Sequence, residues 1–314
     1  MKLSIIIPHH NQPDLLKIML DSIKADPQTQ IIVVDDNSDQ YLDAYAVLTK
    51  DPAYRKVLFL KSPADQRGPG CARNIGIENA NGTYLMFCDA DDYLVDDYDR
   101  KIAPYLDSEI DMVYFTPISR ILGTMQDAHR VDKYIKLIED HLKNPSQKTE
   151  DALRYIFYIN PSKLIKRSMV EEHHIRFDEL MVSEDVMFAT YTGHYAKTLA
   201  ATADVIYCAT RSPHSLTMTQ TKSTYDTRFS VILRQHDFVR KALGEKRYKR
   251  LDMPSLVFIA NAFTYHLGIG TAFSSAITMV RHHIPILRLN QFKPTRILSF
   301  LRYNNKAQRT HSKS

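Results

Sequence analysis

Six aspartates fall within the eleven residues that begin at Asp89. So many like charges are costly to hold together unless water or a cation neutralises them. An EF-hand calcium loop does not fit, because position 6 counted from Asp89 is Leu94 and position 12 is Arg100. The Asp-x-Asp-Asp turn at 89–92 instead suits a divalent ion that keeps open positions for a diphosphate. A solvated acidic turn is the alternative interpretation.

Two further acidic pairs stand at the borders of predicted elements. Glu184-Asp185 opens a predicted helix over 184–194, where Asp185 either takes a proton from a reacting group or only satisfies backbone N–H groups after the N-cap candidate Ser183. Asp35-Asp36 follows a short apolar run, and helix capping is again the alternative to ligand binding.

The elements that must position these acids follow from hydrophobic patterning. Short apolar runs predict strands over 3–8, 31–34, 57–60 and 84–88, and helical spacing predicts helices over 14–24, 40–49 and 70–81. This alternation predicts an α/β fold with a mostly parallel sheet and covering helices. Ligands of such sheets bind beyond the carboxyl ends of the strands. We therefore expect 9–11, 35–36 and 89–92 to meet at one edge.

The second half of the chain predicts a change of organisation. Strands are expected over 111–118 and 198–208, with a polar insertion or helical excursion over 120–150 between them. The pattern is helical from about Tyr225. We therefore expect a catalytic domain over 1–218, a helical region over 219–303 and a disordered basic tail over 304–314.

Several function classes lack their motifs. The first strand is followed by Pro8-His9-His10-Asn11 and not by a glycine-rich loop, and there is no Walker A sequence, which argues against redox and P-loop functions. The three cysteines form no CxxC pair, so a disulfide framework and a cysteine zinc site are not expected, and a reducing compartment fits.

Charge is distributed unevenly along the 314 residues. The chain carries a net charge of +5, yet residues 281–314 contain eight Lys or Arg and no Asp or Glu, so the body is mildly acidic. A nucleic-acid partner is therefore not expected. For 281–314, contact with an anionic membrane surface and packing on protein, including a homo-oligomer, both stay open. The uncharged stretch 253–280 favours a buried or interfacial helix over a membrane span.

Three segments, in this order and spacing, carry a family resemblance. They read LSIIIPHHNQPDLL, IIVVDDNSDQ and GPGCARNIGIENANGTYLMFCDADDYL, and SEDVMFA follows at 183–189. Together they resemble the family 2 inverting glycosyltransferases of the GT-A fold, over roughly residues 1–215. The resemblance implies a Rossmann-like GT-A domain that binds a UDP-sugar donor.

The resemblance also implies roles for individual residues. Asp185 is expected to be the catalytic base, with Glu184 beside it on the acceptor side. Asp91 is expected to be the principal ligand of Mn²⁺ or Mg²⁺, with Asp89 near the ribose and metal. The residues implied in nucleotide-sugar binding are Pro8, His10, Asp35, Asp36, Arg67, Arg73, Asp89, Asp92 and Arg211, and His214 is implied as a late metal ligand.

The implied reaction has a simple physical basis. A divalent cation neutralises the charge that develops on the departing diphosphate, and one carboxylate takes the proton of the attacking hydroxyl. One direct displacement inverts the anomeric carbon and needs no second nucleophilic carboxylate. The expected acceptor is a glycan or lipid-linked intermediate of surface polysaccharide synthesis, at the cytoplasmic face of the membrane. The alternatives are a catalytically degenerate relative that only binds, and a sugar-nucleotide nucleotidyltransferase.

Overall fold

A computed structural model describes residues 1–211 and 220–286 of the chain. Its strands are β1 (Leu3–His9), β2 (Thr29–Asp35), β3 (Val57–Lys61), β4 (Tyr84–Phe87), β5 (Tyr93–Leu94), β6 (Met112–Ile121), β7 (Lys163–Lys166) and β8 (Leu199–Arg211). They form one sheet in the order β3-β2-β1-β4-β7-β6-β8-β5. The first four are parallel, whereas β7 runs antiparallel to both neighbours and β5 antiparallel to β8.

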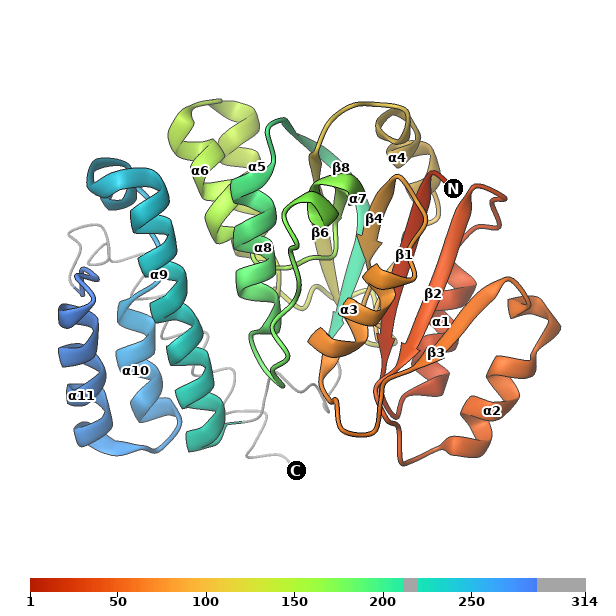
Figure 1. The fold of residues 1–314 in the computed structure, drawn as a ribbon, viewed down its shortest axis with the longest axis horizontal. Helices are drawn as coiled ribbons and strands as arrows, with labels where there is room; N and C mark the ends of the chain where they lie inside the picture. Colours follow the sequence, from red (N-terminus) through yellow and green to blue (C-terminus); the bar gives the residue numbers. More distant parts are fainter. Residues whose placement is uncertain (212–219, 287–314) are drawn as a thin grey trace. The chain divides into compact units, whose positions relative to one another are not determined.

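Helices cover both faces of this sheet (Figure 1). The helices of the described residues are α1 (Pro13–Ser22), α2 (Leu42–Lys50), α3 (Pro69–Glu78), α4 (Tyr98–Leu106), α5 (Asp132–Lys143), α6 (Gln147–Ile156), α7 (Arg167–Glu172), α8 (Glu184–Tyr195), α9 (Lys222–Arg250), α10 (Leu256–Thr264) and α11 (Gly268–Arg281), with a 3-10 turn at Pro52–Tyr54. Helices α1, α2 and α4 contribute to one core, and α3, α5, α6, α7 and α8 to the other.

The strand β1 lies inside the sheet, between β2 and β4, and every one of its residues is buried. Its alternating side chains divide between the two cores: Ile5 and Ile7 enter one, and Ile6 enters the other. The register pairs Ile5 with Ile31 of β2 and His9 with Asp35. The polar residues that end the two strands are therefore brought side by side, as the predicted parallel sheet requires.

The chain divides into two compact units, Met1–Met253 and Pro254–Ser314. Helix α9 groups with the first unit, and its Arg247 donates two hydrogen bonds to Asp151 of α6. The boundary predicted near 218 lies within 212–219, outside the described residues, and so does the predicted tail over 304–314.

The described part of the second unit is the pair α10 and α11. Their buried residues are small or flexible: Ala262 on one helix, and Ala272, Ser275 and Met279 on the other. Among the described helices, none has both the length and the apolar character that crossing a membrane requires.

Candidate active site

The β2 end of the site is held by buried hydrogen bonds to Asp35. Its carboxylate contacts His9 Nδ1 at 3.1 Å and accepts from the hydroxyl and the backbone N–H of Ser38. Burial alone would raise the pKa of Asp35, but the bonds from His9 and Ser38 outweigh burial and the pKa is lowered. The lowered pKa favours the ionised form of Asp35. The His9 ring also stacks on Tyr45, with 4.6 Å between the ring centroids, and this contact holds the hydrogen-bond partner of Asp35 in place.

Asp36 links β2 to the start of α3. Both of its carboxylate oxygens accept from the backbone N–H of Gly68, at 2.9 Å each. Gly68 has φ +108°, a conformation that favours glycine, and precedes the first residue of α3. Asp36 therefore binds the N–H of the residue that precedes α3, and among the described residues no side chain caps the helix α2 that follows β2. Burial raises the pKa of Asp36.

The other residues predicted on this side differ in exposure. Pro8 is buried in β1 opposite Val34, whereas His10 and Arg67 are exposed. The ring of His10 bonds the backbone oxygen of Asp36 at 2.8 Å, which places it beside the Asp35-Asp36 pair.

The acidic turn after β4 is tied to β8 through Asp92. The Tyr207 hydroxyl donates to its carboxylate, and the Thr210 N–H donates to it at 2.6 Å. Tyr207 also accepts from the backbone N–H of Asp89 at 3.0 Å. Burial raises the pKa of Asp92 well above its usual value. Asp92 thus positions the turn from inside the protein, while Asp89 and Asp91 lie at its more exposed side.

Asp91 is a carboxylate in an electrostatically costly place. Burial raises its pKa to about 6, and the negative charge of Asp89 adds to that rise. Arg130, which donates to the Thr210 carbonyl, and Arg73 both oppose it. The mutual repulsion of Asp89 and Asp91 is the electrostatic condition that a divalent cation relieves, and carboxylate oxygens are the hard ligands that Mg²⁺ and Mn²⁺ take.

Arg73 joins the donor side of the site to the predicted base. Its Nη2 donates to Asp89 at 2.7 Å and its Nη1 donates to Glu184 at 2.8 Å. The guanidinium also lies 5.3 Å from the ring centroid of Phe177. Burial alone would lower the pKa of Arg73, but the two carboxylates raise it. The buried cation therefore holds the end of β4 and the start of α8 together.

This bridge depends on a close approach of α3 to the segment before α8. A Cβ added at Gly70 would lie 2.0 Å from the carbonyl oxygen of Asp178 and 3.1 Å from Glu184 Cβ, so only glycine fits. One turn later, the amide of Asn74 donates to the Phe177 carbonyl at 3.0 Å and accepts from the Phe177 N–H at 2.8 Å. Helix α3 is thus clamped to the chain that leads into α8.

Asp185 lies in the first turn of α8, next to this bridge. Burial raises its pKa to about 7, and the charge of Glu184 adds to the rise while Arg73 opposes it. Asp89 and Arg73 influence the pKa of both Asp91 and Asp185, so the same two charges act on both carboxylates. Ser183 adopts φ 59° and its side chain makes no capping hydrogen bond. An ionisation near neutral pH suits a general base.

A buried lysine beside Asp185 is absent from the sequence-based prediction. Lys163 is 1% exposed, and its Nζ donates to the Phe157 carbonyl at 2.8 Å while lying 4.9 Å from the Phe157 ring centroid. Burial lowers its pKa to about 7, and Asp185 is the carboxylate that opposes this. Nothing in the pattern KLIK distinguishes Lys163 from a surface cation, so only the packing identifies it.

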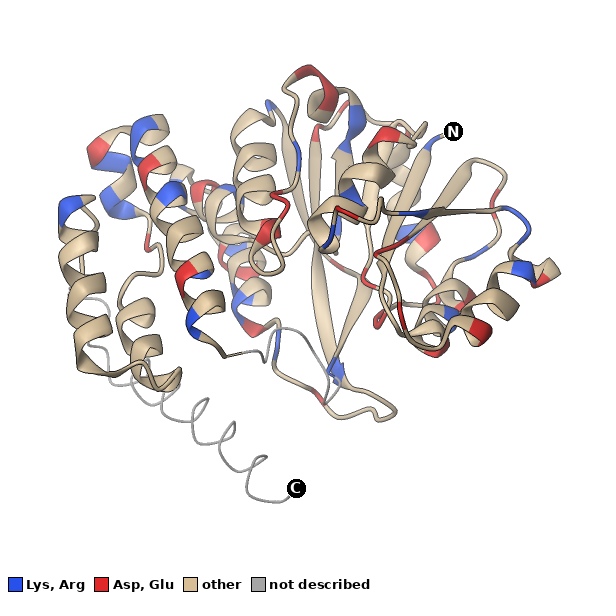
Figure 2. Ribbon diagram, turned by 60° about the horizontal axis from the view of Figure 1, so that its bottom comes forward, with Lys and Arg blue, Asp and Glu red and all other residues tan. Residues whose placement is uncertain are grey.

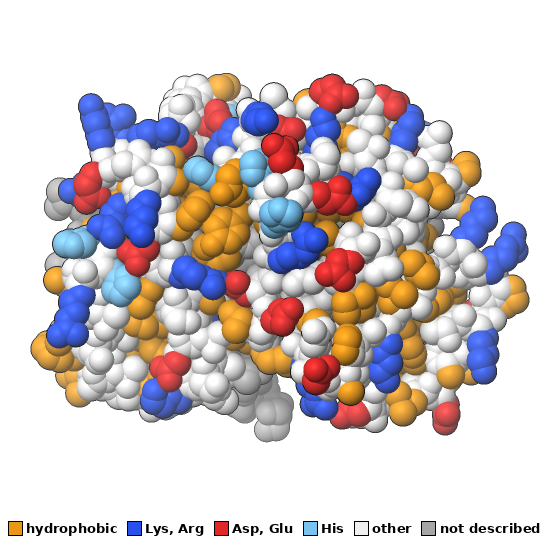
Figure 3. Space-filling model, viewed as in Figure 1, with side chains coloured by type: hydrophobic (Ala, Val, Ile, Leu, Met, Phe, Trp, Pro, Cys, Tyr) orange, Lys and Arg blue, Asp and Glu red, His pale blue; other side chains and the backbone are white. Residues whose placement is uncertain are grey.

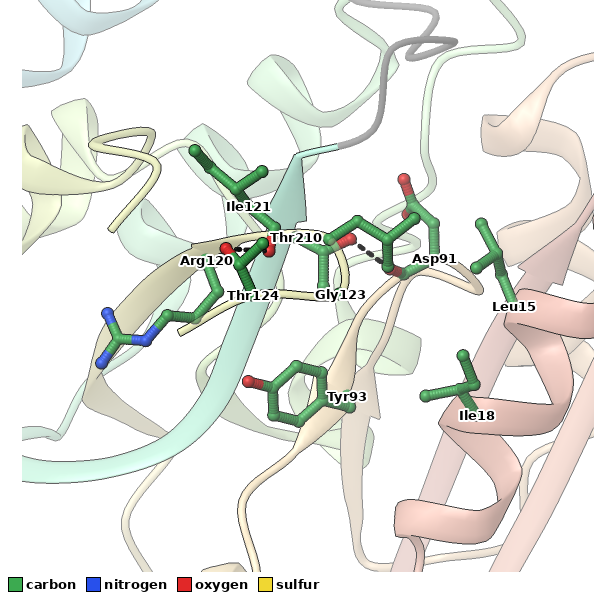
Figure 4. Close-up of a pocket in the computed structure, with 10 residues that line it drawn as sticks. Leu15, Ile18, Asp91, Tyr93, Arg120, Ile121, Gly123, Thr124 and Thr210 are labelled. Carbon is green, nitrogen blue, oxygen red and sulfur yellow. Dashed lines mark hydrogen bonds between the residues drawn. The ribbon is translucent and has the colours of Figure 1, made fainter. Parts of the chain in front are cut away.

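A pocket of about 220 Å³ opens beside Asp91 (Figure 4). Its lining comes from α1, the acidic turn, β5, the end of β6 and β8; the residues are Leu15, Ile18, Asp91, Tyr93, Arg120, Ile121, Leu122, Gly123, Thr124 and Thr210. The Thr210 hydroxyl donates to the backbone oxygen of Asp91 at 2.5 Å, and the Asp91 side chain lies at the rim. The wall of the pocket is mostly apolar, and the Arg120 guanidinium points away from Asp91 and the α1 residues (Figure 4).

Two predicted residues lie at or beyond the end of β8. Arg211 is the last residue of the strand and is half-buried, and His214 lies outside the described residues. In the described part of the chain, three metal-ligating side chains come within 4.8 Å of one another at Asp127, His129 and Asp132. These three are exposed and include neither Asp89 nor Asp91. Figure 3 shows acidic and basic side chains interspersed over the face that carries α3 and α8.

The sequence profile described as Glycosyl transferase family 2 matches residues 4–173, which is more than half of the chain. The chain belongs to glycosyltransferase family 2. The family predicted from the motifs within 3–94 and at 183–189 is therefore confirmed.

Characterised family 2 relatives match a similar part of this chain. The poly(ribitol-phosphate) beta-glucosyltransferase of Bacillus spizizenii is 30% identical over 213 residues, covering 66% of this chain and 32% of the relative. The poly(ribitol-phosphate) beta-N-acetylglucosaminyltransferase TarS of Staphylococcus aureus is 26% identical, covering 66% and 35%. The chain thus spans about a third of the length of these relatives.

The GT-A fold is confirmed by a solved family 2 structure. The crystal structure of S. aureus TarS 1–349 in complex with UDP-GlcNAc superposes with a TM-score of 0.65 at 19% identity, covering 91% of this chain and 82% of that one. The predicted α/β sheet with covering helices, followed by further helices, is therefore correct.

Proposed function

We propose that this chain is an inverting glycosyltransferase that transfers a hexose or N-acetylhexosamine from a UDP-sugar to a hydroxyl of a cell-wall or surface polysaccharide, on a glycan or lipid-linked acceptor. One observation carries the proposal: Arg73 binds Asp89 and Glu184 at once, which supports a single site that includes the acidic turn and Asp185. Relatives named for transfer to poly(ribitol-phosphate) support this class of acceptor.

The proposed reaction is a single displacement at the anomeric carbon. The acceptor oxygen forms a bond to that carbon as the carbon–oxygen bond to UDP breaks, and UDP leaves with the bonding electrons. The acceptor proton passes to the Asp185 carboxylate, which is worth typically ~10²–10⁴-fold in rate. Attack comes from the face opposite UDP, so the configuration inverts.

Asp91, with Asp89, is proposed to hold Mn²⁺ or Mg²⁺. Their shared negative charge and hard oxygen donors fit such an ion, whereas the Asp92 carboxylate is occupied by its bonds from Tyr207 and Thr210. When bound, the ion supplies charge neutralisation for the departing diphosphate. His214 stays proposed as a further ligand.

The nucleotide is proposed to bind along the ends of β1 and β2. Asp35 and Asp36 would receive uracil, with Pro8 and His10 lining the base and Arg67 assisting. The rigid bonds of Asp35 to His9 and Ser38 support a preorganised base site.

The diphosphate is proposed to lie beyond the base site. Arg211 is proposed to contact the diphosphate, and Arg73 is proposed to act on the diphosphate through Asp89. Asp92 contributes by holding the turn against β8. We place the enzyme at the cytoplasmic face of the membrane, where UDP-sugars are the expected donors.

A donor panel tests this proposal. The purified chain would be incubated with Mn²⁺ and a set of UDP-, GDP- and dTDP-sugars, and slow donor hydrolysis and thermal shift would be recorded. We expect a stabilising shift and hydrolysis with one or more UDP-sugars. Stabilisation by GDP- or dTDP-sugars alone would contradict the donor assignment, and nucleotide binding without any turnover, with a poly(ribitol-phosphate) acceptor included, would favour a degenerate binding protein.

A further inference from the structure

Helix α11 exposes its more hydrophobic face. Ile269 is 78% exposed, Phe273 is 68% and Val280 is 61%, and Ile277 is also exposed. At about 100° per residue these four side chains fall within an arc of about 80° on one side of the helix. The buried side, which packs in the α10–α11 pair, carries Ala272, Ser275 and Met279. This is the reverse of the usual amphipathic arrangement, in which the apolar face is covered.

The sequence of the second unit carries charge of a single sign. Residues 254–314 contain eight Lys or Arg and no Asp or Glu, and the first of these cations, Arg281, ends α11. Figure 2 shows α10 and α11 without an acidic or basic side chain until that end. A protein partner of ordinary composition would meet charges of both signs at the rim of its interface. An exposed apolar stripe in a segment whose only charged residues are Lys and Arg is complementary to an anionic lipid surface.

We propose that the exposed face of α11, formed by Ile269, Phe273, Ile277 and Val280, docks on the surface of an anionic lipid bilayer. The stripe enters the boundary between headgroups and acyl chains, and Arg281 at the end of α11 meets the anionic headgroups. Helix α11 has 14 residues, so it is about 21 Å long, shorter than the ~30 Å of the hydrocarbon core. It therefore lies along the interface. The proposal deepens the membrane location in the proposed function by naming the contact surface, and its test is separate from transfer activity because lipid binding needs no substrate.

Vesicle co-sedimentation of the full chain tests this docking. The vesicles are phosphatidylcholine alone, and an equal mixture of phosphatidylcholine and phosphatidylglycerol. The variant carries Phe273→Ser and Val280→Ser. The matched control is Val47→Ser, because Val47 is an apolar helix residue of α2 that is 73% exposed. Thermal unfolding of each variant confirms that the chain is folded, which exposed substitutions should leave unchanged.

We expect the unchanged chain to bind the mixed vesicles and to bind phosphatidylcholine less. The double variant should lose at least about tenfold in partitioning, since binding scales with the apolar area inserted, and Val47→Ser should lose none. Raised salt should weaken binding. The proposal is overturned if the chain does not bind the mixed vesicles or if it binds both kinds of vesicle equally. It is also overturned if the double variant and Val47→Ser lose vesicle binding to the same extent. A self-associated chain that Phe273→Ser and Val280→Ser convert to monomers, without vesicle binding, would show that a second copy covers the face.

Discussion

Asp89 and Glu184, from opposite parts of the catalytic unit, bind the same guanidinium. Arg73 donates to the first at 2.7 Å and to the second at 2.8 Å, and all three flank the predicted base, Asp185. The acid that follows β4 and the acid that opens α8 are thus kept at a fixed spacing by a buried cation. This spacing has consequences for stability, for pH dependence and for catalysis.

Removal of the guanidinium should cost stability as well as activity. Arg73→Met leaves the nearly buried Glu184 carboxylate without its cation, and breaking such a pair costs about 3–5 kcal/mol. Arg73→Lys keeps the charge but cannot reach both acids in the same way. Denaturant unfolding measures the loss, with the exposed Arg67→Met as control. Adding Glu184→Gln to Arg73→Met should recover part of the stability, and a double variant no more stable than Arg73→Met would refute this account.

Asp185→Asn should abolish most transfer and spare donor binding. The amide cannot accept the acceptor proton, so the rate should fall by ~10²–10⁴-fold, while calorimetry should show UDP affinity within about twofold because no nucleotide contact is removed. Asp43→Asn is a matched control, since Asp43 is an exposed acid in the first turn of α2. Transfer that persists within a few-fold in Asp185→Asn would show that another group is the base.

The same substitution should stabilise the protein at neutral pH. Asp185 has a pKa raised from 3.8 to about 7 in the folded chain. Its contribution to stability is therefore full below about pH 4 and is lost as the pH rises through about 7, at ~1.4 kcal/mol per pKa unit. Asp185→Asn, which is always neutral, should be more stable than the unchanged chain at about pH 8 and similar at about pH 4. Unfolding midpoints that differ equally at both pH values would contradict the assigned pKa.

Lys163 should set where activity begins on the pH axis. The base must be ionised, so the transfer rate should rise with pH through about 7, the pKa of Asp185. Lys163→Met removes a nearby positive charge, which should raise the pKa of Asp185 and move this rise to higher pH. The control Lys133→Met keeps Lys163, and its profile should not move. A lower rate with an unshifted profile in Lys163→Met would indicate only a packing role.

Metal dependence should follow Asp91 and not the exposed cluster. Asp91→Asn should remove most of the gain in UDP affinity that Mn²⁺ gives, whereas Asp127→Asn, in the exposed group with His129 and Asp132, should leave that gain unchanged. Calorimetric titrations of UDP with and without Mn²⁺ measure both. Equal UDP affinity in the two conditions for the unchanged chain would remove the metal role proposed for Asp91.

The predicted strands and helices of the first ninety residues are confirmed because local pattern and tertiary role agree there. The Ile-rich run of β1 is buried on both faces, as a central parallel strand must be. By contrast, β7 was not predicted, because its buried Lys163 makes KLIK resemble a surface segment. The polar stretch over 120–150, predicted as an insertion or a helical excursion, contains α5 and the start of α6. Its polar composition is compatible with these helices because an amphipathic helix needs apolar residues only on its covered face.

The site shows the same division between local and tertiary information. The acids were predictable because strand ends and helix starts fix where they lie along the chain. The bridge from Arg73 to Glu184 was not, since it depends on the contact that Gly70 permits between segments distant in sequence. The sequence predicted that Arg73 faces the nucleotide, and only coordinates reveal the two carboxylates on it.

The paired amide contacts between Asn74 and Phe177 constrain how substrates can enter. Because the Asn74 side chain of α3 makes both bonds to the Phe177 backbone before α8, the two segments cannot separate there without breaking both bonds. In the proposed function, a movement that admits the donor or releases UDP must therefore leave the Asn74–Phe177 bonds intact and involve other segments around the site. In the proposed function, sugar preference can then change through other residues of the site while the spacing between the proposed base and the proposed metal turn is kept.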